Sequence, residues 1–123
     1  MRKILTASIL GFALFSVNVA FAHGGGNPRH GGVVQNASDL SFELVATADG
    51  ATIYVEDHGK PMATAGMSGK LMVLAGTNKT EVAMAPVGDK FEAKGVKLAK
   101  GVKVVASLMT SAKKPIVVRF TVK

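Results

Sequence analysis

Short apolar runs separated by turn residues recur from Val33 to the end of the chain. Between Leu40 and Leu44 apolar residues alternate with Ser41 and Glu43, and Ala48-Asp49-Gly50 then leads into a second run. Alternation with a period of two is typical of a half-buried strand, and a short connection containing glycine predicts a hairpin. Further strands are predicted in the runs 52–56, 71–75, 81–85, 91–93, 102–109 and 116–122.

The spacing of these runs predicts the fold class. Seven or eight short strands separated by turn signals are typical of a two-sheet sandwich. The one helical alternative is Ala93–Lys100, and Gly95 and Gly101 disfavour it because glycine destabilises helices. We therefore predict an all-β, antiparallel immunoglobulin-like β-sandwich over residues 33–123. Its predicted core residues are Leu44, Ile53, Val55, Leu71, Val73, Val104, Val118 and Phe120.

The first 22 residues are typical of an export signal peptide. Two basic residues follow Met1, an apolar stretch runs from Ile4 to Phe15, and Ala20-Phe21-Ala22 provides a small-x-small cleavage site. The apolar stretch is shorter than the ~20 residues that a membrane-spanning helix needs. We therefore predict that residues 1–22 are removed and that the mature protein is periplasmic, begins at His23 and does not span a membrane.

The segment that follows differs in composition from the rest of the chain. Residues 23–32, HGGGNPRHGG, include five glycines, one proline and two histidines, and none of them is suited to a hydrophobic core. Such a composition is typical of a terminal segment without regular structure. We therefore predict a flexible Gly/His-rich tail over residues 23–32 and a single folded domain after it.

The overall composition excludes several functions. The chain has 123 residues and no cysteine, so thiolate metal sites and disulfides are excluded. Its formal net charge is +7, and lysines are frequent between Lys90 and Lys103. A nucleic-acid-binding surface there would have several aromatic rings for base stacking, but Phe91 is the only aromatic residue in this stretch. No catalytic constellation is recognisable, since Gly66-Met67-Ser68 lacks the second glycine of a nucleophile elbow. We expect neither an enzyme nor a nucleic-acid-binding protein.

The three histidines are the candidate chemistry. His23, as the mature N-terminus, would present an α-amine and an imidazole, a nitrogen pair suited to Cu(II). His23-Gly24-Gly25-Gly26 also resembles the histidine-glycine repeat of prion proteins, which implies Cu(II) binding through the imidazole and glycine amides. His30 follows seven residues later, so a flexible tail would bring two imidazoles to one ion at a modest loop-closure cost.

A second candidate lies in the predicted turn at Asp57-His58. The carboxylate and imidazole are either a ligand pair, or a ligand with a carboxylate that orients it, or simply a polar turn. Met62 and Met67 flank the same loop, and their thioethers suit Cu(I). The alternative is that these methionines pack in the core or on the surface.

The order of several short motifs resembles a known domain. The chain is similar, over about residues 30–123, to the β-rich accessory domain at the start of periplasmic adaptor proteins of cobalt-zinc-cadmium efflux pumps, and to short exported proteins made of that domain alone. The motifs that carry the resemblance are His30-Gly31-Gly32, Phe42-Glu43-Leu44-Val45, Ile53-Tyr54-Val55-Glu56-Asp57 with Gly59-Lys60-Pro61, Ala85-Pro86 with Gly88-Asp89, and Val117-Val118-Arg119-Phe120.

The resemblance implies a periplasmic protein that binds or relays a transition-metal ion, with a heavy-metal efflux complex or its adaptor as partner. The adaptor domain often has a further histidine near the stretch that corresponds to Lys97–Val104, and this chain has none there. That departure favours a site in the tail. We therefore expect a metal-binding accessory protein for copper or zinc, with His23, His30, Asp57 and His58 as ligands. The alternative is a non-enzymatic envelope module that docks onto a partner protein, without metal, by strand addition or charge.

Overall fold

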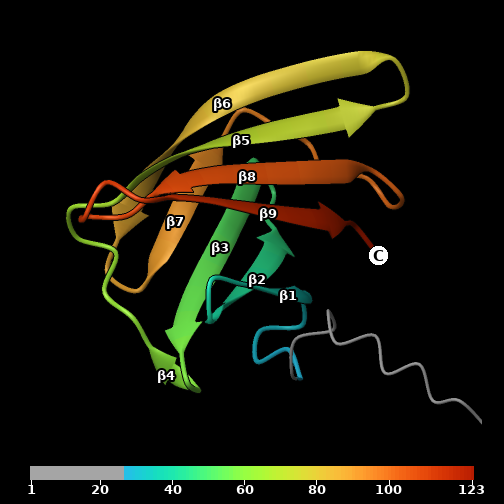
Figure 1. Cartoon of the computed structure of the whole chain (residues 1–123). Helices are drawn as coiled ribbons and strands as arrows, with labels where there is room; N and C mark the ends of the chain where they lie inside the picture. Colours follow the sequence, from blue (N-terminus) through green and yellow to red (C-terminus); the bar gives the residue numbers. More distant parts are fainter. Residues whose placement is uncertain (1–26) are drawn as a thin grey trace, which may run out of the picture.

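The computed structural model describes residues 27–123, and within them every regular element is a β-strand (Figure 1). All strand pairs are antiparallel, which confirms the predicted all-β antiparallel class. Within the same residues no helix is long and apolar enough to cross a membrane. The strands are β1 (Val33–Ala37), β2 (Leu40–Ala46), β3 (Gly50–Asp57), β4 (Lys60–Pro61), β5 (Ser68–Ala75), β6 (Asn78–Val87), β7 (Lys90–Lys94), β8 (Lys103–Met109) and β9 (Pro115–Thr121).

The sheet folds back on itself because β6 takes part in both of its halves. The first part of β6, up to Met84, pairs with β5, and Ala85–Val87 pairs with β7. The resulting strand order is β1-β2-β3-β7-β6-β5-β8-β9, with β4 attached to β3. Figure 1 shows that β8 and β9 lie across β2 and β3, so the two halves enclose the core between them.

The predicted hairpin forms as expected. Leu44 on β2 lies opposite Ile53 on β3, and the Thr47 N–H donates to the Gly50 carbonyl across the turn at 3.0 Å. All eight predicted core residues are buried, with at most 5% of each exposed. Phe42 and Phe91 lie beside them and are the largest of the fully buried side chains.

The connection between β4 and β5 is fixed to the β6–β7 turn by Thr64, which is fully buried. Its backbone N–H donates to the Gly88 carbonyl at 2.9 Å. Its hydroxyl oxygen lies 3.0 Å from the same carbonyl and 3.1 Å from that of Lys90. A buried hydroxyl with these acceptors stabilises the fold, because leaving either group unpaired costs free energy.

The sequence pattern does not predict β1, which lies at one end of the strand order. Its sequence, VVQNA, lacks a clear alternation of apolar and polar residues. Val33 pairs with Leu44 of β2, and Gly32 lies so close to that strand that a Cβ on it would be 2.1 Å from the Leu44 carbonyl oxygen. The chain entering β1 therefore packs tightly on β2, and this places residues 29–32 beside the outer face of the sheet.

Candidate functional site

Glu43 is a buried carboxylate in the middle of β2. Its neighbours Phe42 and Leu44 belong to the core, and only 6% of Glu43 is exposed. In the sheet register Glu43 lies opposite Tyr54 of β3, and Tyr54 lies opposite Lys90 of β7. The alternating pattern of β2 predicts a solvent-facing position for Glu43, but residues 29–32 cover this position.

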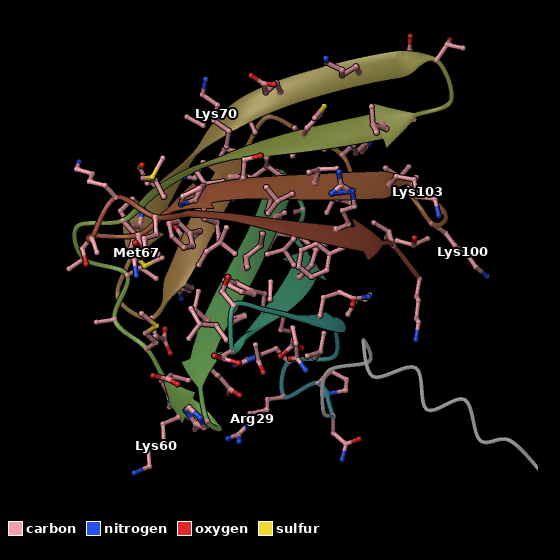
Figure 2. All side chains as sticks on the ribbon, in the orientation of Figure 1. Arg29, Lys60, Met67, Lys70, Lys100 and Lys103 are labelled. Atoms are coloured by element: carbon pink, nitrogen blue, oxygen red, sulfur yellow. The ribbon has the colours of Figure 1, made fainter. Side chains whose placement is uncertain are left out.

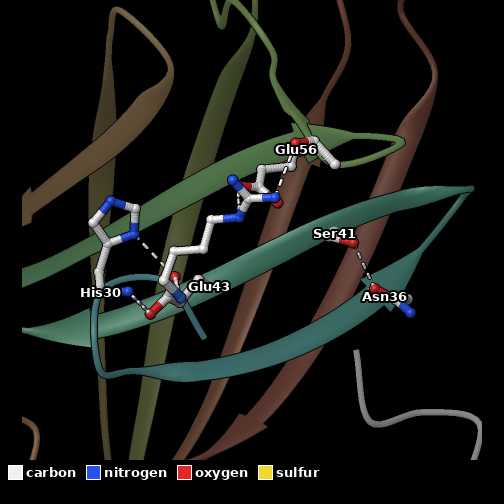
Figure 3. Close-up of polar contacts among 7 residues, drawn as sticks. His30, Asn36, Ser41, Glu43 and Glu56 are labelled. Atoms are coloured by element: carbon white, nitrogen blue, oxygen red, sulfur yellow. Dashed lines mark hydrogen bonds and ion pairs between the residues drawn. The ribbon is translucent and has the colours of Figure 1, made fainter. Parts of the chain in front are cut away.

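The covering segment is held by the Glu43 carboxylate itself (Figure 3). The backbone N–H of Arg29 donates to Oε1 at 3.0 Å, and the backbone N–H groups of His30 and Gly32 each donate to Oε2 at 2.8 Å. The sequence predicts a flexible tail over residues 23–32, whereas its last four residues, 29–32, lie against Glu43 in the structure. A single carboxylate that binds three backbone donors within four residues accounts for that difference.

The His30 side chain completes the set of donors. Its Nδ1 lies 3.0 Å from Glu43 Oε1. Burial raises the pKa of Glu43, but hydrogen bonds from the His30 ring and from the backbone of Gly32, His30 and Arg29 lower it more, so that its pKa falls below the usual 4.5. Glu43 is therefore ionised at neutral pH and only accepts hydrogen bonds, so Nδ1 of His30 carries the proton.

The plane of the His30 ring is fixed by an aromatic stack. The ring centroids of His30 and Tyr54 are 3.6 Å apart, and the angle between the ring planes is 4°. The Lys90 ammonium lies 5.6 Å from the Tyr54 ring centroid. The Glu43 hydrogen bond and the Tyr54 stack together hold the imidazole in one orientation.

A second anchor for the covering segment is Arg29. Its Nε lies 3.1 Å from Glu56 Oε2, and its guanidinium donates to the Gly59 carbonyl at 3.1 Å. This side chain is 58% exposed, so we expect the ion pair to contribute little to stability.

Asp57 and His58, which are also predicted ligands, lie apart from His30. His58 follows the end of β3, with its Nδ1 2.5 Å from Asp57 Oδ1, and 84% of its side chain is exposed. The backbone of His58 has φ 52°, which suits a tight turn. His23 lies outside the described residues. Within residues 27–123, no three histidine, aspartate or glutamate side chains gather into a group able to hold a metal ion.

Both loop methionines considered as thioether ligands take part in packing. Met67 is 5% exposed and belongs to the core cluster, and Met62 is partly buried against it. Figure 2 shows Met67 in the connection that leads into β5. Their burial favours packing over a role as thioether ligands.

The arrangement around His30 leaves one nitrogen for external chemistry. Nδ1 is bound to Glu43, and Nε2 has no hydrogen-bond partner among the described residues, while 40% of the side chain is exposed. A carboxylate that binds one ring nitrogen fixes the tautomer and the orientation of the ring, as it does behind many histidine metal ligands. His30 is a candidate from the sequence alone, but Glu43 and Tyr54 are not, because their roles depend on the register of β2 and β3.

Comparison with known proteins adds no relative to this picture. No protein-family model, no curated protein and no solved structure matches the chain.

Proposed function

We propose that this chain is a periplasmic accessory protein that binds a transition-metal ion, copper or zinc, in connection with heavy-metal efflux or resistance. The observation that supports this most is the pairing of His30 Nδ1 with the ionised Glu43, which leaves Nε2 as the remaining ring nitrogen of a side chain that is 40% exposed. A neutral imidazole held in this way is a common ligand for zinc and copper. The function is binding rather than catalysis.

One imidazole does not make a binding site, so further ligands must come from another part of the chain or from the partner. His23 and the α-amine of a mature N-terminus at that residue precede His30 by seven residues. An extended chain spans at most ~3.6 Å per residue, so a seven-residue connection allows both histidines to reach one ion. In this proposal Glu43 and Tyr54 hold one ligand in place and the N-terminal segment supplies the others.

The location and the partner rest on the sequence. The export signal in residues 1–22 supports the periplasm, and the resemblance to adaptor accessory domains supports an efflux complex or its adaptor as partner. Asp57 and His58 form a separate exposed pair. In this proposal they do not belong to the His30 site.

The test is isothermal titration of the mature protein with Cu(II) and with Zn(II). We expect His30→Ala to weaken binding by about tenfold or more, and Glu43→Gln to weaken it by roughly 10–100-fold because it removes the carboxylate behind the ligand. His58→Ala is the matched control, since it also removes an exposed imidazole, and it should leave the affinity unchanged. Unchanged affinity in His30→Ala, or a loss confined to His58→Ala, would contradict the proposal.

A further inference from the structure

The two ends of the strand order meet along one side of the molecule. Among the described residues, β1 pairs with β2 alone and β9 pairs with β8 alone. β1 and β9 nevertheless lie side by side, with no ladder joining them. Each strand therefore has one edge whose backbone N–H and C=O groups are not used by the sheet.

A groove of about 690 Å³ runs along this junction. Three consecutive residues from each of three strands line it, namely 33–35 of β1, 103–105 of β8 and 119–121 of β9. Neighbouring side chains in a strand point to opposite faces, so consecutive residues line a groove together only where it follows a strand edge or backbone. Both edges of β8 are paired, so the main-chain groups that the sheet leaves free beside the groove are those of β1 and β9.

The charged residues of the groove are all basic. Lys103, Arg119 and Lys123 line it, and no aspartate or glutamate side chain does so among the described residues. Its apolar lining includes Val33, together with the buried Phe120. A single-sign cationic surface of this kind favours an anionic partner and disfavours a second copy of this basic chain, which has 15 basic and eight acidic residues.

We propose that this groove binds an extended acidic segment of a partner protein, which lies along β1 and β9 and bonds to backbone groups there that the sheet leaves unpaired. An extended peptide satisfies strand-edge N–H and C=O groups, and its alternate carboxylates meet Lys103, Arg119 and Lys123. An apolar acyl chain in the same place would leave the edge groups without partners, which costs free energy. This inference does not depend on metal binding at His30.

The probe is a nine-residue peptide of alternating glutamate and valine, acetylated and amidated at its ends. Titration into the mature, isotope-labelled protein, followed by NMR, should shift the amides of β1 and β9 first. The affinity should fall as salt rises, because the contacts are ionic at an exposed site. A peptide with lysine in place of each glutamate, and a glutamate peptide methylated on alternate backbone nitrogens, should each bind about tenfold more weakly or worse.

Charge reversal at exposed positions locates the site on the protein. The Lys103→Glu and Arg119→Glu double variant should weaken binding of the glutamate peptide by about tenfold or more. The matched control is Lys60→Glu with Lys114→Glu, which makes the same change in net charge outside the groove. Figure 2 shows Lys60 and Lys103 on opposite sides of the molecule. Retained amide spectra would show that both double variants are folded.

Four results would overturn the proposal. The first is that both double variants weaken binding of the glutamate peptide equally, and the second is that the methylated peptide binds as tightly as the unmethylated one. The third is that the largest amide shifts lie outside β1 and β9, and the fourth is that no amide shifts at millimolar peptide. Saturable binding of dodecanoate at β9, without binding of the peptide, would assign the groove to an anionic amphiphile instead. Self-association of the protein that the groove variant abolishes would assign it to a second copy of the chain.

Discussion

Glu43→Gln is the substitution that separates the electrostatic role of this buried residue from its shape. Glutamine has nearly the same volume, but it carries one acceptor oxygen and one NH₂ group in place of two acceptor oxygens. The native carboxylate accepts the Gly32 and His30 backbone N–H groups at Oε2, and the Arg29 backbone N–H and the His30 ring at Oε1. An amide cannot satisfy all four contacts.

The loss of stability in Glu43→Gln follows from the more favourable of the two orientations of the glutamine side-chain amide. With its oxygen in the place of Oε2, glutamine keeps the bonds from His30 and Gly32, and its NH₂ can donate to the His30 ring in the other tautomer. The Arg29 N–H then faces a donor and loses its partner. An unsatisfied backbone donor and the loss of charge-assisted bonds together cost about 2 kcal/mol. Glu43→Ala removes every contact, and we expect it to cost about 3 kcal/mol.

The stabilisation by the Glu43 carboxylate should decrease at low pH. The pKa of Glu43 is lowered in the folded protein, so its contribution to stability is present above its unfolded pKa and is lost as the pH falls through the folded pKa. The stability gap between the native protein and Glu43→Gln should therefore be full at pH 7. It should narrow only once the pH is below about 4.5.

Urea unfolding of the metal-free protein, followed by circular dichroism, measures these differences. In thermal unfolding, a loss of about 2 kcal/mol in the free energy of unfolding should lower the melting temperature by about 8–16 °C in a domain of this size. Glu81→Gln is the control, because Glu81 is about half exposed and lies 4.0 Å from Lys70, and it should change stability by less than about 0.5 kcal/mol. Equal stability of Glu43→Gln and the native protein at pH 7, or a gap that stays constant down to pH 3, would refute the reasoning.

Three further outcomes are expected. Thr64→Val leaves the carbonyls of the β6–β7 turn without their hydroxyl donor and should lower the free energy of unfolding by about 1–2 kcal/mol, measured by urea unfolding. Gly50→Ala would place a Cβ 1.8 Å from the Ala93 carbonyl oxygen, so it should lower the free energy of unfolding by about 3 kcal/mol. Its control is Ser111→Ala at an exposed loop position, which should have little effect. The affinity for Cu(II) should fall steeply as the pH is lowered from about 7.5 to about 5.5, because protons compete with the ion for imidazole and amine nitrogens. If titration calorimetry finds an affinity that does not change over this range, His30 is excluded as a ligand.

Most of the fold could be predicted from local pattern. The β2–β3 hairpin follows from alternation and a turn, and the eight predicted core residues are buried because each lies on the apolar side of a strand. β1 could not be predicted, since its sequence has no clear period and its position depends on pairing with β2. The order of the strands, with β6 shared by the two halves, is likewise a property of long-range pairing.

The candidate site could be predicted only in part. Histidine chemistry singles out His30, but nothing near it in sequence indicates Glu43, which lies 13 residues away. An acidic residue in an alternating strand is normally solvent-facing, and Glu43 departs from that rule only because three backbone donors cover it. The sequence offers His58 as a second candidate, yet it is exposed beside Asp57 without a stacking partner among the described residues.

The most direct test of metal binding at His30 is electron paramagnetic resonance of the mature protein with one equivalent of Cu(II). Pulsed measurements detect the remote nitrogen of each coordinated imidazole. If His23 and His30 each supply one imidazole, His30→Ala should reduce that signal by about half, the double variant His23→Ala with His30→Ala should abolish it, and His58→Ala should leave it unchanged. An imidazole signal that is the same in His30→Ala as in the native protein would contradict the account.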